Sequence, residues 1–131
     1  MAENWSTMQI AAIGGATQFR FVTADSGVGN TGQVTDTTAG AVALGVAMNT
    51  AAAGAEVSVV VAGFCEVDCA EALVGGDLVA SDGTGNAVIA ATNDNILGEY
   101  APLPLSGDIP DAVSGDRVRI LLYANKMTLA L

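Results

Sequence analysis

The 131-residue sequence contains no histidine and only four basic residues, which are Arg20, Arg117, Arg119 and Lys126. Without histidine there is no Ser-His-Asp or Cys-His nucleophile pair, no imidazole base near neutral pH and no histidine-ligated zinc. Fourteen acidic residues give a formal net charge of −10. Phosphate binding needs clustered Lys and Arg. We therefore expect no enzyme, no cofactor and no nucleic-acid partner.

Long apolar runs are also missing. The most apolar region, residues 39–64, is interrupted by Asn49, Thr50 and Glu56, whereas a membrane-spanning helix needs roughly 20 consecutive apolar residues. Glu3 stands where a secretory signal peptide carries basic residues, and no apolar block follows it. We expect a soluble chain made in a cytoplasm, with no membrane partner.

What is abundant favours β structure. Valine and isoleucine together number 21 against 10 leucines, and β-branched residues suit pleated strands. Apolar residues alternate with arginines over 117–123, and residues 56–61 and about 17–23 also read as strands. Glycine-rich turns separate these runs, and only residues 68–74 could form one or two helical turns. The pattern predicts a mainly β fold, a single compact barrel or sandwich.

A weak internal repeat divides the chain. Residues 21–25 match 78–82, Leu44-Gly45 matches Leu97-Gly98, and 54–59 matches 115–120, in the same order. Chance similarity between Ala/Gly/Val-rich strands remains the alternative. We predict a β domain at 17–124 with halves at about 17–63 and 76–124. An N-terminal arm at 1–16, a proline-rich surface loop at 101–112 and a C-terminal tail at 125–131 complete the division.

Three motifs have a structural and a chemical interpretation. Residues 27–32 form a G-x-G-x-x-G pattern, but the threonine-rich segment after it is a poor helix, so we read a turn. Cys65 and Cys69 lie about 13 Å apart if the segment is a strand, too far for a disulfide, and a bridge requires a helical turn after Asp68. Glu66 and Asp68 share one strand face, where a solvated pair is favoured over a glycosidase or Ca²⁺ site.

The predicted arm mixes apolar and polar side chains. An aromatic residue on an arm often anchors it to a partner, and a strand-like arm can pair with a neighbour's sheet edge. We predict that the arm crosses onto a neighbouring subunit or shell, with packing on its own domain as the alternative. The predicted interface residues are Trp5, Met8, Ile10 and Ile13.

The order of the turn and strand segments resembles one protein family. The segments are Leu44-Gly45-Val46-Ala47, Ala53-Gly54-Ala55-Glu56-Val57, Gly76-Asp77-Leu78-Val79, Ile96-Leu97-Gly98 and Gly115-Asp116-Arg117-Val118-Arg119-Ile120. Together they resemble the small capsid decoration, or cement, proteins of tailed bacteriophages, over roughly residues 17–124. Each segment is unspecific, and their order carries the resemblance.

The resemblance implies a compact barrel of the β-tulip kind, of two weakly repeated halves, on the outer capsid surface of a virion. Such a protein would bind the major capsid protein, cluster as a homotrimer and stabilise the head. The alternative is a carbohydrate-binding or adhesion module of a phage surface or tail structure. A small enzyme that uses Glu66 and Asp68 is the least favoured reading.

Overall fold

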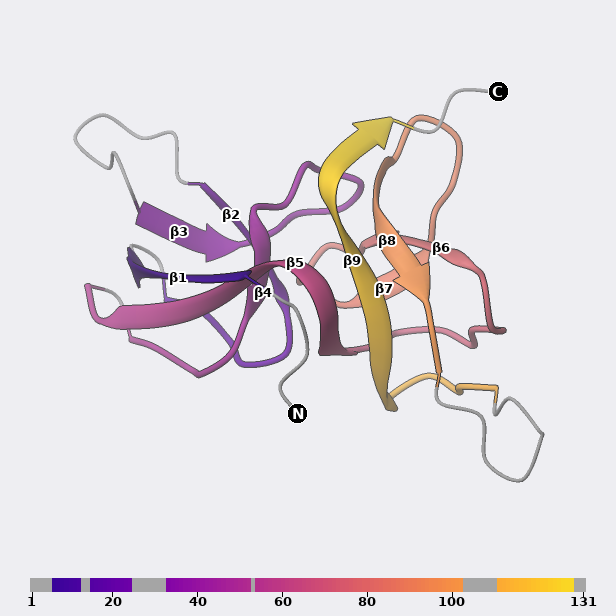
Figure 1. Cartoon of the computed structure of the whole chain (residues 1–131), viewed down its shortest axis with the longest axis horizontal. Coiled ribbons are helices and arrows are strands. Elements are labelled where there is room, and N and C mark those ends of the chain that lie inside the picture. Colours follow the sequence, from indigo (N-terminus) through magenta and orange to yellow (C-terminus); the bar gives the residue numbers. More distant parts are fainter. Residues whose placement is uncertain (1–5, 13–14, 25–32, 53, 103–110, 129–131) are drawn as a thin grey trace.

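The chain forms one continuous β structure in a computed structural model that describes residues 6–12, 15–24, 33–52, 54–102 and 111–128. Those residues hold nine strands and no helix (Figure 1), so the predicted mainly β barrel is confirmed. The strands are β1 (Ser6–Ala12), β2 (Phe21–Ala24), β3 (Gln33–Asp36), β4 (Gly45–Ala47), β5 (Glu56–Asp68), β6 (Leu78–Ser81), β7 (Ala87–Ile89), β8 (Asn95–Tyr100) and β9 (Arg117–Thr128).

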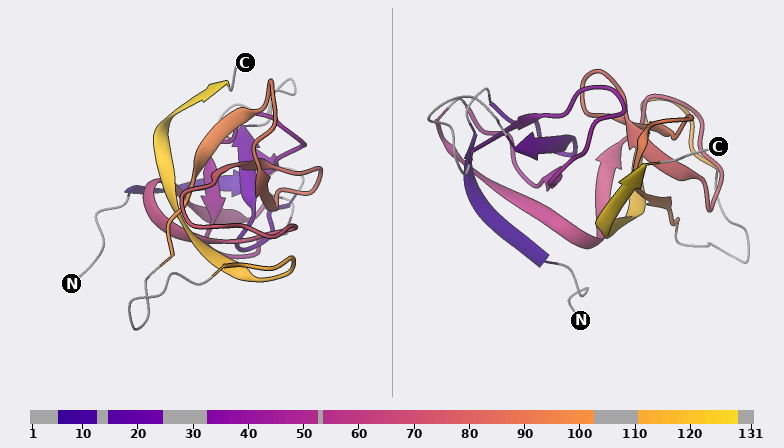
Figure 2. Two further views of the ribbon diagram at one scale, coloured as in Figure 1. Left: turned by 90° about the vertical axis from the view of Figure 1, so that its right-hand side faces the viewer. Right: turned by 90° about the horizontal axis from the view of Figure 1, so that it is seen from above.

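The strands form two rings, which we call lobes. In the first lobe, residues 6–62, the order is β1-β3-β2-β4-β5, and β1 pairs back onto β5 to close the ring. In the second lobe, residues 63–128, the order is β5-β9-β8-β6-β7. A parallel bridge from Cys69 to Ala87 links the chain after β5 to β7 and closes this ring. Figures 1 and 2 show the lobes side by side, with β5 running through both.

Strand β5 belongs to both lobes because it changes partner at Gly63. Up to Ala62 it pairs with β1, and from Gly63 to Asp68 it pairs with β9. Gly63 has a φ of 98°, a conformation that residues with a Cβ adopt only under strain. Gly63 is therefore the position at which one strand passes between the two rings.

The two lobes repeat each other in topology and in detail. The order β3-β2-β4-β5 recurs as β7-β6-β8-β9, with antiparallel pairing throughout both. Gly45 and Gly98 occupy equivalent positions: a Cβ on the first would collide with the carbonyl oxygen of Val60, and on the second with that of Leu121. The repeat read from the sequence is therefore a repeat of the backbone.

The pairing outside the strands repeats as well. Ala16 and Ala51 exchange two backbone hydrogen bonds of 2.9 Å. In the second lobe Leu73 and Ala112 exchange bonds of 3.1 and 2.9 Å at the corresponding positions, 57 and 61 residues later. These are the same offsets that relate the strands in the sequence comparison. The first bridge holds the segment that precedes β2, and the second holds the segment that precedes β6.

The main hydrophobic core is shared between the lobes. It contains Phe21, Val46 and Val60 of the first lobe together with Leu97 and Ile120 of the second, all almost fully buried. A smaller cluster that includes Val22, Val57 and Val59 lies within the first lobe alone. Burial of apolar surface is the dominant stabilising term in folding, so the lobes are stabilised largely in common.

Turns of one lobe also bond to the other. The Gly85 carbonyl accepts a hydrogen bond from the Phe21 N–H at 2.8 Å, and the Gly40 N–H donates to the Ser81 carbonyl at 2.9 Å. Gly85 has a φ of 88°, and a Cβ there would lie 2.9 Å from the Phe21 carbonyl oxygen. The contact between the lobes thus requires a glycine at this turn.

Two expectations at the N-terminal side are wrong. Residues 6–12 are not an arm but strand β1, which is hydrogen-bonded to β5 and β3 of the same chain. The strand expected at about 17–23 begins at Phe21, since residues 17–20 form a turn closed by a 3.2 Å bond from the Arg20 N–H to the Thr17 carbonyl. Phe19 within that turn has a φ of 65°.

The remaining boundaries also differ from expectation. Residues 68–74 are not helical: Asp68 ends β5, while Cys69 and Leu73 make isolated bridges. Residues 125–128 belong to β9 rather than to a tail. The first lobe therefore begins before residue 17, and the second begins at 63. Of the predicted loop at 101–112, residues 103–110 lie outside the described residues, as does the glycine pattern at 27–32.

Candidate interaction surface

The predicted interface residues lie at the start of the first lobe. The backbone of Met8 pairs with Val59 and that of Ile10 pairs with Val57, both on β5 of the same chain. Trp5 and Ile13 lie outside the described residues. Residues 6–12 of the predicted arm therefore pair with a sheet edge of their own chain, whereas the prediction was a neighbour's sheet edge.

Glu66 and Asp68 lie opposite arginines in the pairing of β5 with β9. Both lie on β5, where Glu66 pairs in register with Arg119 and Asp68 with Arg117. The Asp68 carboxylate accepts a 3.0 Å charge-assisted bond from Arg117 Nε, with the two side chains 29% and 48% exposed. An exposed pair of this kind contributes little to stability. The arrangement gives the strand pair a balanced charge on its outer face.

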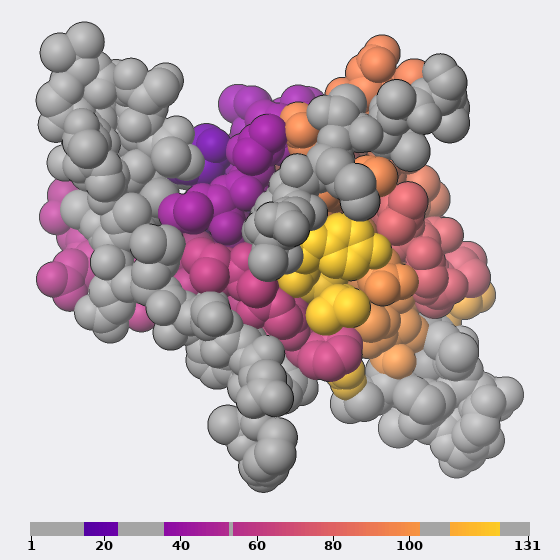
Figure 3. Space-filling model, turned by 45° about the horizontal axis from the view of Figure 1, so that its top comes forward, coloured from indigo at the N-terminus to yellow at the C-terminus, as the bar shows by residue number. Residues whose placement is uncertain are grey.

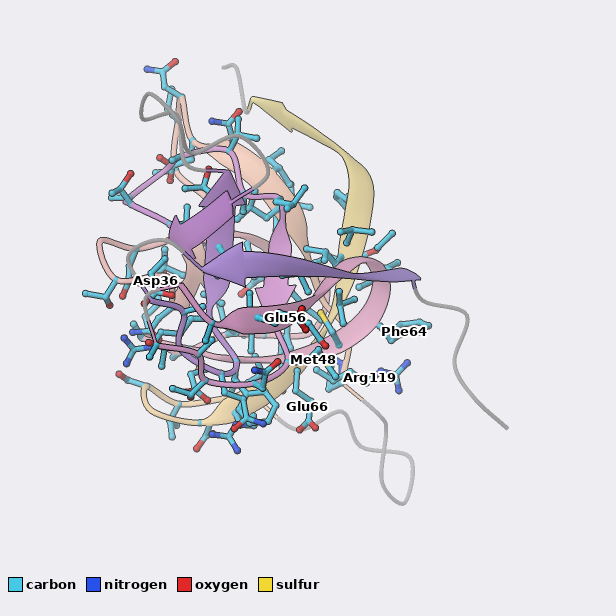
Figure 4. The ribbon with its side chains drawn as sticks, turned by 90° about the vertical axis from the view of Figure 1, so that its left-hand side faces the viewer. Asp36, Met48, Glu56, Phe64, Glu66 and Arg119 are labelled. Carbon is cyan, nitrogen blue, oxygen red and sulfur yellow. The ribbon has the colours of Figure 1, made fainter. Side chains whose placement is uncertain are left out.

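Each of these arginines also covers an aromatic ring. The guanidinium carbon of Arg117 lies 3.7 Å from the centre of the Phe19 ring, and that of Arg119 lies 3.9 Å from the centre of the Phe64 ring. Such cation–π contacts are favourable by roughly 0.5–1 kcal/mol at exposed sites. Figure 4 shows Phe64 and Arg119 close together on the outside of the molecule, and Figure 3 shows β9 exposed beside β5.

Sequence reasoning missed these contacts, although part of the signal was visible. The alternation of Arg117 and Arg119 on β9 matches the alternation of Asp68 and Glu66 on β5, which indicates two facing strands. The contact of Arg117 with Phe19 was not accessible, because Phe19 leaves the expected strand through its positive φ. A ring on an unrecognised turn cannot be placed by periodicity.

Other polar groups serve local structure. The pKa of Asp82 is lowered from its ordinary value: burial acts to raise it, but hydrogen bonds from the Thr84 and Asn86 N–H groups, at 2.8 and 2.9 Å, and from their side chains prevail. These hydrogen bonds to Asp82 close the turn that contacts the first lobe.

Burial raises the pKa of Tyr123, and the neighbouring Glu99 adds to that shift.

The two cysteines are separate buried thiols, not joined to each other. Burial raises the pKa of the Cys69 thiol, which donates a hydrogen bond to the Val113 carbonyl at 3.2 Å. A raised pKa means little thiolate at neutral pH. Within the described ranges, no three His, Cys, Asp or Glu side chains gather as metal ligands would. Among those same residues, no helix has the length and apolar character to cross a membrane.

The ends of the two lobes differ in chemistry. In the first lobe, Thr17 donates from its N–H and its hydroxyl to the two carboxylate oxygens of Asp36, at 3.1 and 3.0 Å. The corresponding positions in the second lobe are Val74, 57 residues after Thr17, and Ile89, 53 residues after Asp36. Their side chains are 56% and 46% exposed. A polar closure in one lobe thus becomes an exposed apolar surface in the other.

Comparison with known proteins identifies the fold. No protein-family model matches the chain, and no curated protein matches it. Among solved structures, the chain is similar to the N base of head fiber gp8.5 of bacteriophage phi29. The TM-score is 0.71 at 14% sequence identity, and the similarity covers 94% of this chain and 98% of the phage chain. At this identity the likeness establishes a shared fold along nearly the whole of both chains.

Proposed function

We propose that the protein is a structural component of a phage head that binds the outer surface of the capsid and cements neighbouring major capsid proteins. The observation that carries the proposal is the likeness in fold to a phage head-fiber base, which extends over 94% of this chain and 98% of the other. The resemblance of the turn and strand order to capsid decoration proteins supports the same role independently. Assembly as a homotrimer on the capsid belongs to the proposal.

Charge agrees with an exterior position. Packaged DNA fills the inside of a phage head, so a chain with a net charge of −10 is repelled from the inner wall and tolerated on the outer one. Asp68 and Asp82 have local partners, which are Arg117 and the groups of the turn that follows Asp82. These features suit a protein that acts through its surface.

A carbohydrate-binding or adhesion module is the second candidate. Such sites use exposed aromatic faces, but Phe21 and Tyr100 are buried, and arginines cover the rings of Phe19 and Phe64. Among the described aromatic residues this leaves Tyr123, which is partly buried. The observations therefore favour a protein partner over a glycan.

The proposal is tested with purified protein and empty expanded capsids of the phage that encodes it. Co-sedimentation should saturate at a fixed number of copies per capsid, and the loaded capsids should withstand heating better than bare ones. Native mass spectrometry measures the oligomeric state before binding. A glycan array tests the second candidate. Absence of capsid binding together with binding to defined glycans would replace the first proposal with the second.

A further inference from the structure

We define the apolar end of the second lobe as Val74, Ile89 and Val113. Their side chains are exposed, and the fold does not require apolar residues at these positions. The three side chains are 56%, 46% and 61% exposed. The first lobe builds the same backbone with Thr17, Asp36 and Ala52 at the corresponding positions. Because polar or small residues satisfy this fold, the exposed valines and isoleucine are not explained by folding.

The repeat and the backbone pairing place the three residues at the same end of the second lobe. In the first lobe the side chains of Thr17 and Asp36 are in hydrogen-bond contact, which places the equivalent Val74 and Ile89 at the same end of the second ring. Val113 follows Ala112, whose backbone is bonded to Leu73, the neighbour of Val74. Leu73 and Ala112 point into the core at 0% and 3% exposure, so their neighbours face outward.

A carboxylate stands beside each apolar residue. Asp77 accepts a hydrogen bond from the Val74 N–H at 2.8 Å, and Asp116 accepts one from the Val113 N–H at 3.0 Å. The Glu71 carboxylate accepts a hydrogen bond from the Ile89 N–H. These bonds fix three negative charges around the apolar surface.

We propose that the apolar end of the second lobe is the surface that docks on the capsid, against a protein patch that is apolar at its centre and carries Lys or Arg at its rim. This inference rests on the proposed function. Charge complementarity indicates the partner. The apolar side chains would pack on an apolar centre, and the carboxylates around them would pair with basic residues at the rim of the partner's patch. A second copy of this chain fits poorly: it has only four basic residues, and Arg117 and Arg119 already contact Asp68, Phe19 and Phe64.

The test makes the apolar surface polar, with nearly unchanged side-chain shape at the two valines and a side chain one carbon shorter at Ile89. The triple variant Val74→Thr, Ile89→Thr, Val113→Thr should bind capsids roughly thirtyfold more weakly than the wild type, while its thermal midpoint stays within a few degrees. Val42→Thr is the matched control, since Val42 is 54% exposed on the first lobe, and it should bind like the wild type. The single variant Val113→Thr, on an exposed turn, serves if the triple variant unfolds, and it should show a smaller loss.

Salt supplies the second readout. Wild-type binding should weaken as the salt concentration is raised, because screening reduces attraction between the carboxylates and a basic rim. Salt-independent binding, or triple-variant binding equal to the wild type, would overturn the inference and leave the proposed function standing. A changed oligomeric mass with unchanged capsid binding would assign the surface to self-association and overturn it too. If the wild type binds no capsid, both the proposed function and this inference are overturned.

Discussion

The two lobes share a backbone but differ in surface. Residues 1–62 carry four acids and one base, whereas residues 63–131 carry ten acids and three bases, a net charge of −3 against −7. Four of the five large hydrophobic residues that are exposed among the described ones also lie in the second lobe. The comparison separates what the fold requires, which recurs in both lobes, from what it leaves open, which differs between them.

The largest effect is expected at the glycines that recur. Gly45→Ala and Gly98→Ala each drive a Cβ into a backbone carbonyl oxygen of the neighbouring strand, and each should destabilise the protein by about 3 kcal/mol or more. Urea denaturation measures the loss. Gly83→Ala is the control, because a Cβ there meets nothing within 4 Å. If only one of the two glycines proved critical, the lobes would not be equivalent at this position.

The Asp82 turn should show the next largest effect. Asp82→Ala removes the acceptor for the Thr84 and Asn86 N–H groups and should cost roughly 2 kcal/mol at neutral pH. Because the folded pKa is lowered, the carboxylate adds stability above its unfolded pKa, and this is lost as the pH falls through the folded value. Chemical denaturation of both proteins across the acidic range checks this. A gap between the two curves that persists in strong acid would contradict it.

Exchange of residues between the lobe ends sharpens the comparison. Thr17→Val removes the hydroxyl that donates to the Asp36 carboxylate and leaves the backbone N–H donor in place, and it should cost about 1 kcal/mol. The reverse change in the second lobe, Val74→Thr, should alter stability by less than about 0.5 kcal/mol, since the side chain is exposed. Thermal or urea unfolding of both variants measures the asymmetry. Equal costs would mean that the second lobe needs its valine for folding.

The smallest effect is expected at the ion pair on β5 and β9. Asp68→Asn removes the charge that faces Arg117 and should cost about 0.5 kcal/mol, less in high salt. The corresponding pair in the first lobe is Ala11 opposite Glu56, so the fold does not depend on charges here. A loss above about 2 kcal/mol would show that the pair is more than a surface contact.

How far the sequence predicts this fold depends on whether a feature is local. The alternation over 117–123 and the order of the repeated segments are local, and both predicted real strands and a real repeat. Strand β1 was missed because its place is set by pairing with β5, some fifty residues away. The predicted first half ends at about residue 63, because the sequence does not show that the same strand continues past it into the second ring.

The candidate surface was harder to predict for a related reason. Val74, Ile89 and Val113 lie in three separate segments, and each alone reads as an ordinary β-branched residue. Their exposure becomes informative only by comparison with the first lobe, where Thr17 and Asp36 occupy the positions equivalent to Val74 and Ile89. Met8 and Ile10, which the sequence singled out, instead lie on a strand paired within its own chain.

The shared core also sets the thermodynamics of association. Since Phe21, Val46 and Val60 pack in one cluster with Leu97 and Ile120, the lobes cannot turn against each other without opening that cluster. Binding normally costs conformational entropy wherever a flexible joint must be ordered. A partner that touches both lobes meets two ends already held at a fixed separation and angle. The affinity of such a contact is therefore not reduced by any cost of aligning the lobes.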